Sequence, residues 1–285
     1  MSAIDSRPAS IAGIKHLAKS LKKNQCISHS AALDLASVRA GFSNFRHAQK
    51  HLPDIAPAHY SISVRCYWRD TETDTKGVET LVISLPLPLS KLLTKYQLAH
   101  AQQLIEFEIV DDLTFVRGRA VQYQSTAQSV VCEAARTLAF MAATGLRPSS
   151  AYSRAYPNAQ ELRELLYFPK YRFRHGRIPG EDHASIWYHS ETKGYVIADE
   201  PYEAAVADAK VRQEREAWCE CFGVSMVKPE WSGMYAPDGN SRLYLFARNE
   251  KEIPIQAMKA ALDALPPPYT VKEWRGESEV MQWKR

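Results

Sequence analysis

The chain has 285 residues, of which 45% are apolar and 24% charged, and its formal net charge at pH 7 is +4. This is the composition of a globular protein. No apolar run reaches the roughly 18 residues that a membrane helix needs, and residues 1–10 lack the apolar segment of a signal peptide. We therefore expect a soluble, cytoplasmic protein with no membrane partner, made of one small and one large domain.

Residues 11–23 predict a helix, because apolar residues recur there at helical spacing. Lysines fall largely on its other face: Lys15, Lys19, Lys22 and Lys23. Ser28 or Ser30 is expected to cap a second helix, since a short side-chain oxygen can accept a free backbone N–H. Gly41 then ends that helix, and Ser43 or Asn44 starts a third.

Charge is concentrated in this part of the chain. Residues 11–52 hold seven basic residues, Arg46 among them, against Asp34 as the one acid, a net charge of +6. Residues 53–285 carry a net charge of −2. We assign residues 1–55 to a basic three-helix module, and the uneven charge indicates either an acidic partner or a solvated lysine face.

Three short motifs in this module carry a family resemblance. They are Ile14-Lys15-x-Leu17-Ala18-Lys19-x-Leu21-Lys22-Lys23, Ile27-Ser28-His29-Ser30-x-Ala32-Leu33-Asp34 and Gly41-Phe42-x-Asn44-Phe45. They resemble a helical module at the N-terminus of a plasmid- and mobile-element-associated bacterial family of unknown function, and related modules accompany glyoxalase-like domains. The resemblance implies no known reaction, and the large domain shows no matching glyoxalase metal ligands.

Residues 56–285 predict a larger domain in which a hairpin followed by a helix occurs four times. Strands alternate polar and apolar residues, as in His59–Arg69, and Asp199 is expected to cap one of the helices. A last strand is predicted at Tyr269–Arg275. We expect an α+β fold of two ββαββα halves, about residues 59–146 and 184–275, joined by residues 147–183, and we interpret them as a pseudo-duplication with antiparallel sheets.

The joining segment interleaves aromatic and basic residues between Tyr167 and Arg177. Cations that contact phosphates, with aromatic rings that stack on bases, are typical of single-strand binding. A strand with one buried aromatic face and one wet basic face would give the same pattern. The candidate nucleic-acid-binding residues are therefore Lys15, Lys19, Lys22, Lys23, Arg46, Lys170, Arg172, Arg174 and Arg177.

Histidines and acids also gather near the end of this segment. His175, Glu181, Asp182, His183 and His189 are of metal-ligand type, but their spacing matches no standard site. His183 with Asp182 is an alternative as a general acid/base pair. We expect no metal and no cofactor.

Five cysteines are present: Cys26, Cys66, Cys132, Cys219 and Cys221. Their odd number and scattered spacing argue against a disulfide framework and favour a reducing compartment. Cys219 and Cys221 lack a further ligand nearby, so packing is the preferred interpretation.

Three functions compete on this sequence. The favoured hypothesis is an accessory protein that binds nucleic acid, or a nucleic-acid-associated partner, through the basic module. The second is an enzyme with a site between the two halves of the large domain, and the third is an adaptor whose module docks a protein. No catalytic motif decides between them.

Overall fold

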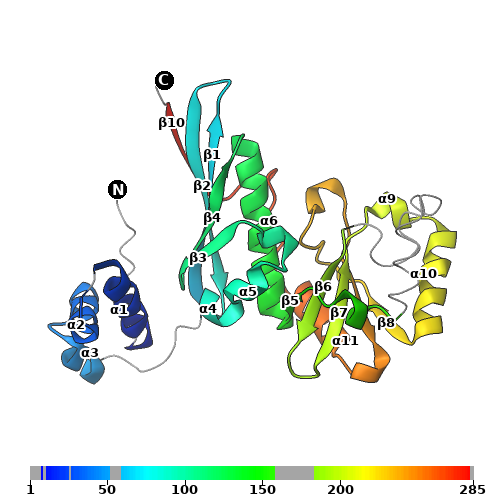
Figure 1. The fold of residues 1–285 in the computed structure, drawn as a ribbon, viewed down its shortest axis with the longest axis horizontal. Coiled ribbons are helices and arrows are strands. Elements are labelled where there is room, and N and C mark those ends of the chain that lie inside the picture. Colours follow the sequence, from blue (N-terminus) through cyan, green and yellow to red (C-terminus); the bar gives the residue numbers. More distant parts are fainter. Residues whose placement is uncertain (1–7, 9–10, 26, 52–58, 158–182, 283–285) are drawn as a thin grey trace.

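The computed structural model of the protein describes residue 8 and residues 11–25, 27–51, 59–157 and 183–282. These residues form a mixed α+β fold with two five-stranded sheets in which antiparallel pairs dominate, as the sequence predicts (Figure 1). No helix in the described part of the chain is long and apolar enough to cross a membrane.

The N-terminal segment contains three helices, α1 (Ile11–Gln25), α2 (His29–Arg39) and α3 (Phe45–His51). The Ser28 hydroxyl accepts the N–H of Ala31 and so caps α2. Gly41 follows α2 with a φ of +91°, in the left-handed region that favours glycine. The three helices share a small apolar cluster: Ile11, Ile14, Ala18, Leu21, Ala32, Ala36 and Ala48.

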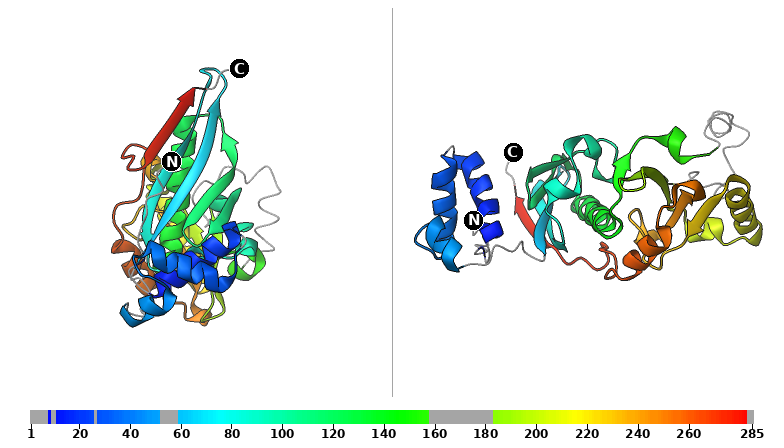
Figure 2. Two further views of the ribbon diagram at one scale, coloured as in Figure 1. Left: turned by 90° about the vertical axis from the view of Figure 1, so that its left-hand side faces the viewer. Right: turned by 90° about the horizontal axis from the view of Figure 1, so that it is seen from below.

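The first sheet has the strand order β10-β2-β1-β4-β3. Its strands are β1 (Tyr60–Asp70), β2 (Thr75–Leu85), β3 (Phe107–Asp111), β4 (Thr114–Val121) and β10 (Glu277–Gln282). Between β2 and β3 lie α4 (Leu89–Leu92), α5 (Lys95–Leu98) and the 3-10 turn η1 (Gln102–Leu104). Because β10 pairs with β2, the end of the described chain returns to the first sheet, as both views of Figure 2 show.

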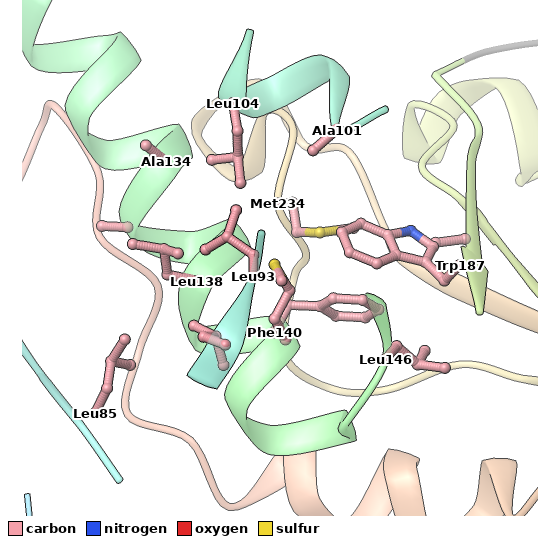
Figure 3. Close-up of a cluster of buried hydrophobic side chains, with 14 of the residues drawn as sticks. Leu85, Leu93, Ala101, Leu104, Ala134, Leu138, Phe140, Leu146, Trp187 and Met234 are labelled. Atoms are coloured by element: carbon pink, nitrogen blue, oxygen red, sulfur yellow. The ribbon is translucent and has the colours of Figure 1, made fainter. Parts of the chain in front are cut away.

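Helix α6 (Gln124–Thr144) is the central helix that the sequence predicts. It covers one face of the first sheet and contacts helix α11 on its other side (Figure 2). The helix ends at Gly145, whose φ is +72°. Phe140 of α6 lies against Trp187 of the second sheet, with ring centroids 4.8 Å apart. Figure 3 shows this contact, with Met234 beside the indole, so the apolar core is continuous from one sheet to the other.

The second sheet has the order β5-β6-β7-β9-β8, with antiparallel pairs throughout. Its strands are β5 (Arg147–Ser149), β6 (Ser185–His189), β7 (Gly194–Asp199), β8 (Val224–Val227) and β9 (Tyr244–Arg248). Its helices are α7 (Tyr152–Ala155), α9 (Glu203–Val206), α10 (Ala209–Phe222) and α11 (Ile255–Asp263), with 3-10 turns η3 (Pro237–Gly239) and η4 (Asn249–Lys251).

The two halves repeat the order of their elements but not the order of their strands. In the first sheet β4 lies beside β1 and parallel to it. In the second sheet the corresponding strand, β9, lies beside β7 and antiparallel to it. The duplication therefore stays a prediction that the strand order does not support.

Two local predictions are wrong. Asp199 does not cap a helix: it ends β7, where it is buried, and Asp208 caps α10 by accepting the N–H of Lys210. The last strand is not at Tyr269–Arg275 but follows directly, at Glu277–Gln282. In both places tertiary pairing, which has no local signal, decides the outcome.

Candidate functional site

The lysines of α1 form one exposed stripe. Lys15, Lys19, Lys22 and Lys23 are all exposed and lie within an arc of roughly 100° of the helix, given 3.6 residues per turn. The stripe borders the buried face that carries Ile14. Because α1 contains no acidic residue, no carboxylate of this helix neutralises the stripe.

The rest of the helical segment adds to this charge. Arg46 is exposed on α3, so the structure places it in the same three-helix segment as the lysines. Asp34, the one acid of residues 11–52, accepts the N–H of Phe45 and so joins α2 to the start of α3. Lys23 also reaches the large domain, where its ammonium lies 3.4 Å from the carbonyl of Val110. The candidates Lys170, Arg172, Arg174 and Arg177 lie outside the described residues.

A second polar cluster lies between the two halves of the large domain. Arg136 of α6 is buried and donates to three backbone carbonyls: Met234 at 2.7 Å, Tyr235 at 2.7 Å and Tyr269 at 2.5 Å. Glu200, which directly follows β7, accepts the N–H groups of Met234 at 2.5 Å and Tyr235 at 3.0 Å. The two charged side chains thus fix one short stretch of backbone.

Two carboxyl groups near Arg136 have a raised pKa. Burial raises the pKa of Glu200 to about 7, against the lowering effect of its two backbone N–H bonds. Burial also raises the pKa of Glu133, one turn before Arg136 on α6, to about 7. Burial lowers the pKa of Arg136 itself. Such shifts occur at catalytic sites and in structural networks alike, so geometry has to decide between the two.

The geometry favours a structural network for Glu200. Its side chain is fully buried, and its Oε1 atom is occupied by backbone N–H groups. Gly233 approaches so closely that a Cβ atom there would lie 2.1 Å from Glu200 Oε1. The Glu200 carboxyl is thus buried, with Oε1 engaged by backbone, and is not open to solvent.

His183 lies at the same end of the second sheet. Its ring stacks on Tyr235 with centroids 3.5 Å apart, and Tyr202 contacts it edge-on. Its proposed acid/base partner Asp182 lies outside the described residues, as do His175 and Glu181. His189 is buried, and its Nδ1 lies 2.9 Å from the hydroxyl of Thr192 in the adjoining turn.

The metal-type residues do not converge in the described part of the chain, where no group of three or more His, Cys, Asp or Glu side chains is placed to hold an ion. Cys219 and Cys221 both lie within α10, two residues apart, so they point to different sides of the helix. Cys219 is buried, which raises its pKa to about 11, and Cys221 is exposed.

Arg136 also lines an apolar pocket of about 290 Å³. It lies between α6, the end of β2, and the segment that follows α11. Alanines of both helices, Trp231 and three successive prolines, Pro266–Pro268, form much of its wall. Arg136 is the one charged residue among those that line it.

Sequence reasoning missed several buried charges. Asp199 pairs with Arg215 at 2.8 Å, and both side chains are 2% exposed. Glu79 of β2 accepts hydrogen bonds from Trp68, Gln124, Gln128 and Ser278. Glu79 carried a signal, because it occupies an inward position of an otherwise apolar alternation.

Comparisons with known proteins add no relative: no family model matches the sequence, and neither a curated protein nor a solved structure does. The resemblance of the N-terminal helices therefore rests only on the motifs quoted above.

Proposed function

We propose that the protein binds nucleic acid through the lysine stripe of α1, within an N-terminal helical module that folds on its own. The single observation that carries the proposal is that four exposed lysines lie on one side of a helix without acidic residues. Lysines in such an array neutralise phosphates and release their condensed counterions, which drives binding that does not depend on base sequence.

The contacts within the segment support a separate module. Among the described residues, its apolar cluster draws only on α1, α2, α3 and the turns between them. Asp34, the one acid of residues 11–52, lies on α2, and its carboxylate accepts the backbone N–H of Phe45. The four lysines of the stripe are exposed, and Lys23 in addition lies within reach of the Val110 carbonyl.

The motif resemblance supports an accessory role in plasmid or mobile-element biology, where nucleic acid is the common partner. Exposed Arg46 on α3 adds to the positive charge of the same segment. Lys170, Arg172, Arg174 and Arg177, which lie outside the described residues, remain candidates from the sequence alone. The enzyme alternative has less support, because Glu200 is buried against backbone and His183 stacks on Tyr235 with Tyr202 edge-on to it.

A charge-deletion variant tests the proposal. Lys15→Gln, Lys19→Gln, Lys22→Gln and Lys23→Gln are combined in the full-length chain, and binding to fluorescein-labelled single- and double-stranded DNA and RNA is measured by anisotropy. The variant should bind at least about tenfold more weakly on every sequence, since phosphate contacts position the protein without reading bases.

The matched control removes the same number of charges elsewhere. Lys91, Lys95, Lys210 and Lys251 are exposed lysines of the large domain, and their replacement by glutamine lowers the net charge equally. The control should keep most of its affinity. Equal losses in the two variants would contradict a specific role for α1, and wild-type protein that binds no nucleic acid would favour the adaptor alternative.

A further inference from the structure

We propose that the pocket beside α6 is a binding site for a small organic anion, with the apolar body of the ligand in the pocket and its anionic group directed to Arg136. The site is independent of the lysine stripe and lies between the two halves of the large domain.

The shape of the pocket fits a small molecule. Its volume of about 290 Å³ is close to the lower limit of the roughly 300–1,000 Å³ typical of ligand pockets. The wall is apolar, and its small residues Ala139, Ala142 and Ala143 on α6 face Ala261 and Ala264 at the end of α11. Alanines on both helices leave the space that larger side chains would fill in a close-packed core.

The wall is also rigid where the ligand would contact it. Pro266, Pro267 and Pro268 have fixed φ angles, and Tyr269 is held by its carbonyl bond to Arg136. A pocket that is already formed loses little entropy on binding.

The charge of Arg136 selects an anion. Three of its five N–H groups donate to backbone carbonyls, which carry no formal charge. The groups that interact with it electrostatically are Cys132 and Glu133 on α6, and Glu200 and Asp238 from the second half. The atoms that accept its hydrogen bonds are neutral, and two of the nearby carboxyls, Glu133 and Glu200, have a pKa of about 7 and so are only partly ionised near neutral pH, which leaves part of the Arg136 charge available to a further anion.

The surrounding carboxyls give this attraction a pH dependence. Glu133 and Glu200 both have a pKa of about 7, so each loses its charge as the pH falls from 8 to 6. Less of the Arg136 charge is then offset, so the anion should bind more tightly at pH 6 than at pH 8.

The test uses 4-phenylbutyrate as the probe and its neutral analogue 4-phenylbutanamide as the comparison, with calorimetry on the full-length chain. The acid should bind at least about tenfold more tightly than the amide, and its affinity should rise several-fold from pH 8 to pH 6. Equal affinity for the two compounds would overturn the role of Arg136, and no binding of either would overturn the site.

Ala143→Leu locates the binding, since it fills the pocket and leaves Arg136 in place. Ser129→Leu is the control, because Ser129 is exposed on α6 and does not line the pocket. Ala143→Leu should abolish binding of the acid, with a near-ultraviolet circular dichroism spectrum like that of wild type, and Ser129→Leu should keep it. Unchanged binding in Ala143→Leu would overturn the location. A second filling variant, Ala142→Leu, serves if Ala143→Leu fails to fold.

Discussion

Arg136 and Glu200 hold the same dipeptide, Met234–Tyr235, one at its carbonyls and the other at its amides. Arg136 belongs to α6 of the first half, whereas Glu200 follows β7 in the second. The loop that contains the dipeptide is therefore fixed to both halves through buried charges. Removal of either side chain would take away two of the hydrogen bonds that fix this dipeptide.

Gly233 should be intolerant of any side chain because of this arrangement. Its φ is +113°, and a Cβ atom would lie 2.1 Å from Glu200 Oε1. We expect Gly233→Ala to lower the free energy of unfolding by about 3 kcal/mol, from backbone strain and displacement of the carboxylate. Gly145→Ala is the control, since Gly145 also has a positive φ but nothing lies within 4 Å of its Cβ position. It should cost about 1 kcal/mol, and similar losses in the two variants, measured by urea unfolding, would contradict the close contact.

The Glu200 carboxyl should make stability fall as the pH rises. Its pKa is about 7 in the folded protein and about 4.5 in the unfolded chain. Between these values the folded state binds more protons, so the free energy of unfolding decreases from about pH 4.5 to pH 7 and this contribution is then constant. Relative to Glu200→Gln, wild type should lose on the order of 2 kcal/mol between pH 5 and pH 8. If the difference in the free energy of unfolding between wild type and Glu200→Gln does not change with pH, the pKa of the carboxyl is not raised by folding.

Ser278 should hold the C-terminal strand in the first sheet. Its hydroxyl donates to Glu79 at 2.5 Å, which links β10 to the buried carboxylate of β2. Ser278→Ala should therefore weaken β10 by about 1–2 kcal/mol and raise amide hydrogen exchange across Glu277–Gln282. Glu279→Ala, on the other face of the same exposed strand, should leave exchange nearly unchanged. Equal exchange in both variants would count against the hydroxyl contact.

The buried pair of Asp199 and Arg215 should respond to substitution in a non-additive way. Each single change, Asp199→Leu or Arg215→Met, leaves one charge buried and should cost about 3–5 kcal/mol. The double variant should lose clearly less than the sum, because both members of the buried pair are then replaced by apolar side chains. Additive losses in a urea-unfolding double-mutant cycle would mean that the two side chains do not interact.

Local patterns in the sequence predict most of the elements. Alternation over His59–Arg69 gives β1, and helical spacing gives α1 with its lysines on the exposed side. Gly41 and Gly145 mark helix ends because each adopts a positive φ there. These features depend on neighbours within a few residues, so no tertiary information is needed.

The predictions that were wrong concern features that depend on residues far apart in the sequence. Asp199 resembles a helix cap because it follows a predicted strand. In the structure it forms a buried ion pair with Arg215 of α10, sixteen residues further along the chain. The pairing of β10 with β2 joins residues about two hundred positions apart. The strand orders of the two sheets differ although their elements recur, because strand order depends on long-range pairing that the local pattern does not encode.

The dependence of nucleic-acid affinity on salt tests the central claim most directly. Anisotropy titrations of wild type on one labelled duplex, from low to physiological salt and beyond, should give a slope of log affinity against log salt of about −3.6 or steeper, since each of four phosphate contacts contributes roughly −0.9. The variant that lacks Lys15, Lys19, Lys22 and Lys23 should show a slope flatter by about 3.6. A wild-type slope near zero, or an equal slope in wild type and the variant, would contradict binding through the lysine stripe.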